Sequence, residues 1–582
     1  MRLINTKTLE LHEFFDENTP PYAILSHAWG DQEVTFQDWQ NRQQVKRKGG
    51  YWKILKACNE ALKHRLEWLW VDTNCIDKSS SAELSEAINS MFAYYQKSEV
   101  CFAYLVDVPT ANQPEDVLHS QIERSRWFTR GWTLQELIAP KHLIFHAGDW
   151  SEIGKNDGTL TFLVTSITQI RDEYLDGQSN IHSASVAERM SWLSKRTTTR
   201  TEDMAYCMLG IFNINMPLLY GEGKRAFVRL QEEIMRTSND HTIFCWEWNE
   251  DVPKDWGSLL APWPTTFEAA GDFCPAISHE ISIYSMTNAG LSIRLPTMTT
   301  PISTHWVGNW VVVLQATSRP LIAKSHKPRQ VACIRVAGHR IGDLLHVSRI
   351  PSLPRPMTIS EDHVGRSLTQ ALVVTRKFRL RGEEVRNNES TPDFDDERKL
   401  HFLPVVAGQP IRNSQAPKWR FEHLHGEDVS LDSAVGTITL KVDEGGIGVG
   451  AIMMEYYDGP SSIASNLLLG AGLENDACNV SVEFGGLSSK VTHNTFIQLP
   501  SKERLFRRWS SGSTLDSRDM ERILRQWTQQ VMLDKFTRPL VSYSQEFNLT
   551  MVLERAIDVM RGSRSCYFLI FYKGYFVRAL VP

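Results

Sequence analysis

Short apolar runs and amphipathic segments alternate along the first 150 residues of the chain. Four runs have the length and composition of buried strands, and they cover residues 22–26, 68–71, 100–106 and 142–145. Between the runs, apolar residues recur at helical spacing over 52–64, 83–97 and 132–139. This β-α-β order predicts a parallel sheet with helices on both faces, the doubly wound arrangement of α/β proteins.

The pattern changes twice along the rest of the chain. Residues 202–212 and 224–236 are predicted helices, and beyond about residue 255 strand-like runs predominate. These runs cover 306–314, 330–336, 371–380, 436–442, 477–484 and 566–572, with a helix near 517–536 and a charged loop or linker over 382–399. We therefore predict three regions: an α/β core over 1–150, a helical extension over 151–250 and a β-rich region over 251–582, built as a sandwich or barrel, with a sensor or regulatory role.

The composition excludes several classes of protein. Hydrophobic residues make up 42% of the chain and charged residues 23%, as in globular proteins. The net charge of −5 argues against a dedicated nucleic-acid-binding protein. The nine cysteines include no CxxC pair, so we expect neither a disulfide scaffold nor a metal site. Without an N-terminal apolar run or a stretch of about 18 apolar residues, we expect a cytoplasmic protein with no membrane span.

Polar residues cluster where three of the predicted strands end or lead into a helix. Because ligands bind at the carboxyl ends of parallel strands, these clusters are expected to share one rim of the sheet. Trp132 and Glu136 are four positions apart and therefore lie on the same helix face, with Glu136 an exposed carboxylate. An aromatic ring beside a carboxylate suits a nucleotide pocket. The candidate residues are Ser26, His27, Trp29, Asp72, Trp132 and Glu136.

Each candidate also has a structural interpretation. Glu136 could be a solvated surface carboxylate or cap the short helix, and Trp132 could be a packing residue. Asp72 could accept backbone N–H groups in its own loop. Cys75 and His27 follow neighbouring strands and could form a nucleophilic pair, although a small buried thiol is the simpler interpretation of Cys75.

Several sequence blocks resemble the fungal heterokaryon-incompatibility (HET) domain. They occur in the family's order over roughly residues 1–250: Tyr22-Ala-Ile-Leu-Ser-His-Ala-Trp-Gly30, Trp70-Val-Asp-Thr-Asn-Cys-Ile-Asp-Lys78, Arg130-Gly-Trp-Thr-Leu-Gln-Glu-Leu-Ile-Ala-Pro140, then blocks beginning at Ala187, Arg200 and Met216. The resemblance implies a role in fungal nonself recognition that ends in growth arrest or cell death, with a protein partner that the sequence does not identify.

The strand and helix order is also similar to that of Toll/interleukin-1 receptor (TIR) domains. Plant TIR domains carry a Ser-x-Trp-Cys-Leu-x-Glu-Leu pattern whose Glu is catalytic in NAD+ cleavage. Trp132-Thr-Leu-Gln-Glu-Leu137 fits that pattern with Thr133 in place of Cys, and Gly131 precedes Trp132. The resemblance implies that Glu136 is catalytic, that NAD+ or a related nucleotide is the substrate, and that the active form is a homo-oligomer. No further cofactor is expected.

The implied reaction is physically reasonable for one carboxylate. Cleavage of the nicotinamide–ribose bond releases neutral nicotinamide, so the leaving group needs no general acid. The ribose develops oxocarbenium character, which a nearby carboxylate stabilises. Two alternatives stay open: a HET domain that acts only by assembling partners, and a thiol hydrolase that uses Cys75.

Overall fold

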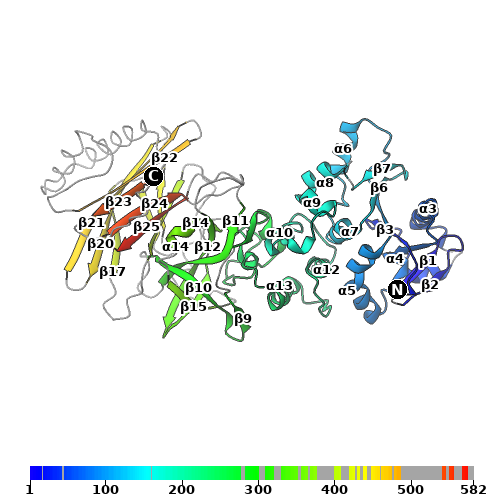
Figure 1. Cartoon of the computed structure of the whole chain (residues 1–582), viewed down its shortest axis with the longest axis horizontal. Helices are drawn as coiled ribbons and strands as arrows, with labels where there is room; N and C mark the ends of the chain where they lie inside the picture. Colours follow the sequence, from blue (N-terminus) through cyan, green and yellow to red (C-terminus); the bar gives the residue numbers. More distant parts are fainter. Residues whose placement is uncertain are drawn as a thin grey trace. The chain divides into compact units, whose positions relative to one another are not determined.

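The computed structural model divides the chain into two compact units (Figure 1). Unit 1 comprises residues 1–243 and 260–272, and unit 2 comprises 244–259 together with 273–582. The structure describes residues 1–15, 18–41, 45–156, 158, 160–276, 282–300, 308–319, 329–350, 356–364, 368–375, 399–407, 418–425, 429–432, 437–441, 447–458, 461–474, 477–486, 540–544, 549–555 and 566–573.

A seven-stranded sheet forms the centre of unit 1, in the order β2-β1-β4-β3-β5-β6-β7. Its strands are β1 (Arg2–Asn5), β2 (Leu11–Glu13), β3 (Ala23–His27), β4 (Trp68–Val71), β5 (Val100–Leu105), β6 (Leu143–Ala147) and β7 (Glu152–Lys155). The four central strands are parallel, and the pairs at both edges are antiparallel. In order of appearance the parallel strands lie 2-1-3-4, so the direction of winding reverses beside β3. Ligand sites of open α/β sheets form at such a reversal.

The four parallel strands confirm the sequence prediction to within two residues at each end. They are almost continuously buried, because helices cover both faces of a parallel sheet. The edge strands β1, β2 and β7 were not predicted. They are only three or four residues long, and β2 and β7 are largely exposed, so their sequences lack a buried apolar run. The sheet is therefore mixed at its edges.

Three crossover helices position the carboxyl edge of the sheet. Helix α3 (Gly49–Lys63) packs on β4, whereas α5 (Ser81–Lys97) contacts the short α7 (Thr133–Ile138), which in turn contacts β3. Right-handed crossovers in opposite directions from β3 place α3 on one face of the sheet and α5 with α7 on the other. A single helical turn, α4 (Asp72–Cys75), starts directly where β4 ends. Figure 1 shows these elements around the blue and cyan strands.

A helical extension follows the sheet. It contains α8 (Thr161–Thr168), α9 (Asp172–Leu175), α10 (Val186–Ser191), α11 (Asp203–Tyr206), α12 (Leu209–Phe212) and α13 (Arg225–Thr237). The prediction of a single helix over 202–212 is wrong in one respect, because the structure has two short helices there, α11 and α12. The break lets α12 pack so closely on α5 that a Cβ atom at Gly210 would lie 2.0 Å from Cβ of Phe92.

Residues 260–272 complete unit 1 after the chain has contributed 244–259 to unit 2. The Gln231 side chain both donates to the carbonyl of Ala261 and accepts its N–H, each at 2.9 Å. The 3-10 helix η4 (Pro264–Phe267) packs against α10. Unit 1 is thus assembled from two separate stretches of chain.

Unit 2 is rich in β-structure, as the sequence predicts for the C-terminal region. One sheet contains β8 (Phe273–Pro275), β9 (Tyr284–Thr287), β10 (Gly290–Thr300), β11 (Gly308–Ser318), β12 (Gln330–Ile341), β13 (Leu344–Arg349), β14 (Met357–Ser360), β15 (Leu368–Val374), β16 (Lys399–Ala407), β18 (Val429–Asp432), β19 (Thr437–Lys441), β23 (Leu540–Ser544), β24 (Leu549–Arg555) and β25 (Cys566–Lys573). A second sheet contains β17 (Lys418–His425), β20 (Ile447–Asp458), β21 (Ser461–Glu474) and β22 (Ala477–Gly486).

Within the larger sheet, β10, β15, β13, β12 and β11 pair in a closed ring. Closure removes exposed edges from these strands, as in a small barrel. The predicted helix 517–536 lies outside the described residues, as does the predicted linker except for its last residue.

Candidate functional site

Ser26 and Glu136 form a buried hydrogen-bonded pair at the carboxyl edge of the parallel sheet. Ser26 is next to the last residue of β3, and Glu136 lies on α7. The Ser26 hydroxyl donates to Oε2 of Glu136 at 2.5 Å and accepts the indole N–H of Trp127 at 2.9 Å. Glu136 is only 7% exposed, so the prediction of an exposed carboxylate is wrong. We call Ser26 and Glu136 the inner pair.

The buried surroundings of the inner pair favour the neutral form of Glu136. Burial raises the pKa of Glu136 to about 8, and the negative charge of Asp72 acts in the same direction. The hydrogen bond from Ser26 and the positive charge of Arg130 act in the opposite direction without compensating for the burial. A carboxyl group with this pKa exchanges its proton near physiological pH, which is a property of catalytic acids and bases.

A second group of residues lies on the outer side of the same edge. The Trp29 indole N–H donates to Oδ2 of Asp72 at 3.0 Å, and Nζ of Lys78 lies 3.4 Å from the same oxygen. Nζ of Lys78 also lies 3.5 Å from the centre of the Trp29 ring. Trp29 is 40% exposed, and the side chains of Lys78 and Asp72 are 32% and 20% exposed, so this group is accessible from solvent.

Glu33 and Lys53 extend this outer group. Nζ of Lys53 lies 2.6 Å and 2.7 Å from the two carboxylate oxygens of Glu33, and Gly30 donates its N–H to Glu33 at 2.8 Å. Burial alone would raise the pKa values of Glu33 and Asp72, but nearby positive groups hold both below their usual ranges. Trp29, Glu33, Lys53, Asp72 and Lys78 are called the outer cluster below.

In the sequence, His27 lies between Ser26 of the inner pair and Trp29 of the outer cluster. Its side chain is almost completely buried. Its Nε2 atom is 3.6 Å from Glu33 and 3.9 Å from Asp72, beyond hydrogen-bonding distance. Burial, reinforced by the charge of Lys53, lowers the pKa of His27, so the ring is neutral near pH 7. Neither ring nitrogen has a hydrogen-bond partner among the described residues.

Other buried polar atoms along this edge also lack partners in the described part of the chain. They belong to Thr73 and Asn74 of α4, to Gln135 of α7, and to Nη2 of Arg196. Unpaired buried polar groups are costly and uncommon in folded proteins, so a concentration of them indicates bound water, a ligand or a rearrangement on binding. This feature marks the carboxyl edge as the candidate site.

Trp132 is directed elsewhere. Its indole N–H lies 3.3 Å from Oδ2 of Asp203, whose other oxygen accepts the Tyr220 hydroxyl at 3.0 Å. Trp132 therefore belongs to a cluster with the helical extension, and among the described residues its side chain forms no hydrogen bond or ring contact with Glu136 or Trp29. The shared helix face expected for Trp132 and Glu136 does not bring the two side chains into one site.

The helical extension fixes the segment that carries Glu136. The Gly131 N–H donates to the carbonyl of Thr197 at 2.8 Å, and Thr197 donates to Thr129 at 2.7 Å. Nη1 of the buried Arg196 donates to the carbonyl of Arg130 and to the Thr133 hydroxyl, at 2.9 Å and 3.0 Å. A Cβ atom at position 131 would lie 2.5 Å from Cγ2 of Thr198, so this approach requires glycine.

Cys75 does not have the properties of a nucleophile. Burial raises the pKa of its thiol to about 12, and its sulfur accepts the backbone N–H of Val71 at 3.4 Å. A catalytic thiol requires a depressed pKa and an adjacent base. The structure therefore argues against the thiol-hydrolase alternative. None of the seven cysteines whose side chains the structure describes forms a disulfide.

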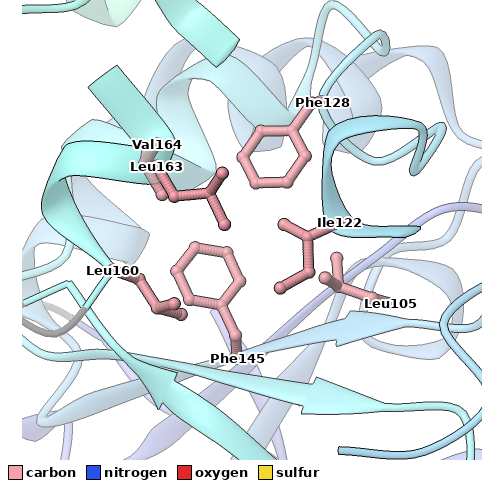
Figure 2. Close-up of a pocket in the computed structure, with 7 residues that line it drawn as sticks. All are labelled: Leu105, Ile122, Phe128, Phe145, Leu160, Leu163 and Val164. Atoms are coloured by element: carbon pink, nitrogen blue, oxygen red, sulfur yellow. The ribbon is translucent and has the colours of Figure 1, made fainter. Parts of the chain in front are cut away.

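A separate pocket in unit 1 is entirely apolar. Figure 2 shows its lining residues, which come from β5, β6, α6 (Glu115–Glu123), α8 and adjoining loops: Leu105, Ile122, Phe128, Phe145, Leu160, Leu163 and Val164. The absence of polar side chains from this lining suits hydrophobic packing and not the recognition of a nucleotide.

Five further residues of this edge were not among the predicted site residues: Glu33, Lys53, Lys78, Trp127 and Arg196. Lys78 lies within the second HET-like block, so the resemblance could have drawn attention to it. Arg196, between two other blocks, and Lys53, on an amphipathic helix, have no local sequence signal that distinguishes them from ordinary surface cations.

The fold and the site define an α/β protein with a doubly wound parallel core and a polar carboxyl edge. Residues 22–116 match the heterokaryon incompatibility protein (HET) family, and residues 225–259 match a domain of unknown function, DUF8212. The chain is 46% identical over 221 residues to vegetative incompatibility protein HET-E-1 of Podospora anserina. The chain is a HET-domain protein.

The similarity to HET-E-1 covers 37% of this chain and 16% of that relative. No solved structure matches the chain. None of the helices in the described residues combines the length and apolar character that a membrane crossing requires.

Proposed function

We propose that this HET-domain protein is a cytoplasmic effector of fungal nonself recognition and regulated cell death, and that it cleaves NAD+ at the nicotinamide–ribose bond. The role in incompatibility rests on the HET domain and on the similarity to HET-E-1. The reaction rests on the resemblance of residues 132–137 to the catalytic pattern of plant TIR domains. The observation that carries it is the Ser26–Glu136 pair at the reversal of the sheet.

The protonation of Glu136 fits a cationic substrate. Ionised Glu136 stabilises the positive charge that develops on the ribose as neutral nicotinamide leaves. In the free protein, burial keeps the pKa of this carboxyl near 8. A cationic nicotinamide ring nearby would favour the carboxylate and lower that pKa, because opposite charges stabilise each other. Binding of NAD+ would thus prepare the group that the reaction uses.

The other candidate residues take supporting roles in this proposal. The exposed ring of Trp29 provides a stacking surface for a flat base. Asp72, which accepts a hydrogen bond from Trp29, also accepts one from a ribose hydroxyl of the substrate. Ser26 is fully buried and already bonded to Glu136, so it orients the carboxyl group instead of contacting the substrate. His27 supports the outer cluster, and Trp132 fixes α7 against the extension.

The strand order supports the comparison with TIR domains. The 2-1-3-4 order of the parallel strands is part of the flavodoxin-like order, in which the ligand binds beside the first and third strands. Here these strands are β3 and β5, and Ser26 is near the end of β3. The antiparallel edge strands and the helical extension are additions to that arrangement.

The direct test is to incubate the purified full-length chain with NAD+ and measure released nicotinamide by liquid chromatography. We expect nicotinamide to appear together with ADP-ribose or a cyclic product in equal molar amounts. If NAD+ stays intact over a concentration range of protein that includes the assembled form, the proposed reaction is wrong.

One observation favours a second candidate function. Glu136 is 7% exposed and Ser26 is fully buried, so the inner pair is closed in this structure. A permanently closed edge would make the HET domain a non-enzymatic module that signals cell death by assembling partners. In that case substitution of Glu136 by Gln would leave toxicity in a fungal host unchanged, whereas an NAD+-cleaving effector would lose it.

Self-association offers a way to open and complete the site. TIR-like enzymes generally build their sites across a contact between protomers, and we propose the same for this chain. Turnover per protomer should then rise with protein concentration. A flat rate per protomer across a hundredfold dilution, with the protein monomeric throughout, would exclude this form of activation. We further propose that a separate protein is the recognition partner and that the β-rich region has a sensor or regulatory role.

A further inference from the structure

Two arginines beside the outer cluster have unpaired guanidinium groups. Arg126 is exposed and Arg130 is half-buried, and neither side chain has a hydrogen bond or ion pair with any other residue that the structure describes. The positive charge of Arg126 acts on Lys53, and that of Arg130 acts on Lys78 and on Glu136. Both residues lie in the segment between α6 (Glu115–Glu123) and α7, directly before the helix that carries Glu136.

The backbone holds these two arginines in place even though their side chains are free. The Arg126 N–H donates to Oδ2 of Asp107, just after the end of β5, at 2.9 Å. The carbonyl of Arg130 accepts from Arg196, and its neighbour Gly131 is bonded to Thr197. Flexible side chains on a fixed backbone suit the capture of a ligand that arrives from solvent.

Two of the four cationic side chains near this edge are paired with carboxylates, and the two arginines are not. Lys53 and Lys78 are coupled electrostatically to both Glu33 and Asp72, so these four groups compensate one another. Among the described residues, neither Arg126 nor Arg130 is paired with a carboxylate, and the oxygens of the nearby Asp107 accept the Ser125 hydroxyl and the Arg126 backbone N–H. His27 and Glu136 add no compensating charge while both are neutral.

We propose that Arg126 and Arg130 form an anion subsite that binds the diphosphate of a dinucleotide. A diphosphate bridge carries two negative charges, which matches the two unpaired guanidinium groups, and arginine binds phosphate oxygens through two parallel N–H donors. The identity of the anion as the diphosphate of NAD+ rests on the proposed function. In this proposal one of the two bases stacks on the exposed ring of Trp29, which lies beside Lys78.

The test measures binding and not turnover. The full-length chain is titrated by calorimetry with inorganic pyrophosphate, with ADP and with adenosine. We expect pyrophosphate and ADP to bind, adenosine to bind at least tenfold more weakly than ADP, and added salt to weaken pyrophosphate binding. The double variant Arg126→Gln/Arg130→Gln should lose at least tenfold in affinity for pyrophosphate and for ADP.

Arg124→Gln is the matched control. Arg124 is an exposed arginine two residues from Arg126, it caps the C-terminal end of α6, and it is not among the groups that act on the two lysines. Its substitution should leave pyrophosphate binding unchanged. Thermal melts of both variants check that the fold is kept. If the parent binds no pyrophosphate, or if the double variant binds it as well as the parent does, the subsite is wrong.

The outcomes separate this subsite from the proposed reaction. Arginine-dependent binding of pyrophosphate by a chain that leaves NAD+ intact would retain the subsite and reject the reaction. Cleavage of NAD+ with the same KM in the parent and in the double variant would retain the reaction and reject the subsite.

Discussion

The inner pair and the outer cluster place carboxyl groups of the same chemical type in opposite charge states. Glu136 in the inner pair has a pKa raised to about 8, whereas the pKa values of Glu33 and Asp72 in the outer cluster lie below their usual ranges. Burial acts in the same direction on all three. The difference is that the cationic Lys53 and Lys78 lie next to the outer carboxylates, whereas Glu136 has mainly neutral partners. Such divergence is characteristic of sites that separate a reacting group from binding groups.

The largest effect is expected from a variant that removes the ionisable group of the inner pair. Glu136→Gln keeps the volume of the side chain and an oxygen that accepts from Ser26, but it removes the ionisable group. We expect nicotinamide release to fall by at least a hundredfold, measured as kcat/KM with purified protein. Glu123→Gln, at an exposed position of α6, is the control for loss of a carboxylate. Equal turnover in the parent and in Glu136→Gln would reject Glu136 as the catalytic group.

The same variant tests the charge state of Glu136 through stability. The free Glu side chain titrates near pH 4.3, and in the folded protein the pKa is about 8. The folded state keeps a proton that the unfolded state loses, so the free energy of unfolding falls as the pH rises between these values and levels off above about 8. Between pH 5 and 9 we expect the parent to lose a few kcal/mol relative to Glu136→Gln, at about 1.4 kcal/mol per pKa unit of difference.

Urea unfolding of both proteins at pH 5 and pH 9 makes this measurement. Other groups titrate equally in the two chains, so their contributions cancel in the difference. Parallel pH profiles for the parent and the variant would mean that Glu136 is ionised in the folded state, and the contrast with the outer cluster would disappear.

A smaller effect is expected from Ser26→Ala, which tests how Ser26 influences Glu136. Its hydrogen bond lowers the pKa of Glu136, so Ser26→Ala should raise that pKa further. If the carboxylate is the active form, kcat/KM of the parent rises with pH up to about 8, and the profile of the variant is displaced to higher pH. We expect roughly a tenfold loss at pH 7, about one pKa unit, and much smaller loss at pH 9. A uniform loss at every pH would instead indicate damage to packing around Trp127.

The smallest effect is expected in the outer cluster. Asp72→Asn keeps the shape of the side chain but weakens its interactions with Trp29 and Lys78, so it should raise KM for NAD+ by a few-fold and leave kcat nearly unchanged. Steady-state kinetics of the two proteins separates these parameters. A fall in kcat as large as that of Glu136→Gln would place Asp72 in the reaction itself and remove the distinction between the inner pair and the outer cluster.

The sequence determined the parallel core because its signals are local. The apolar runs of β3, β4, β5 and β6 and the periodicity of α3 and α5 predict their own structure, and the order of elements then restricts the topology. It also placed Ser26, His27, Trp29 and Asp72 at one edge, because parallel strands end on the same side. The antiparallel edge strands were missed, since three or four half-exposed residues carry almost no pattern.

Only the tertiary structure decided which of the candidates meet and in what charge state. Ser26 and Glu136 are 110 positions apart, and their contact depends on α7 being fixed by Gly131, Thr197 and Arg196 from the extension. Trp132, although one helical turn from Glu136, is drawn to Asp203 instead. The pKa of a carboxyl group depends on burial and on the charges around it, and these come from segments distant in the chain. Local patterns therefore predict where polar residues gather, whereas the long-range packing sets their chemistry.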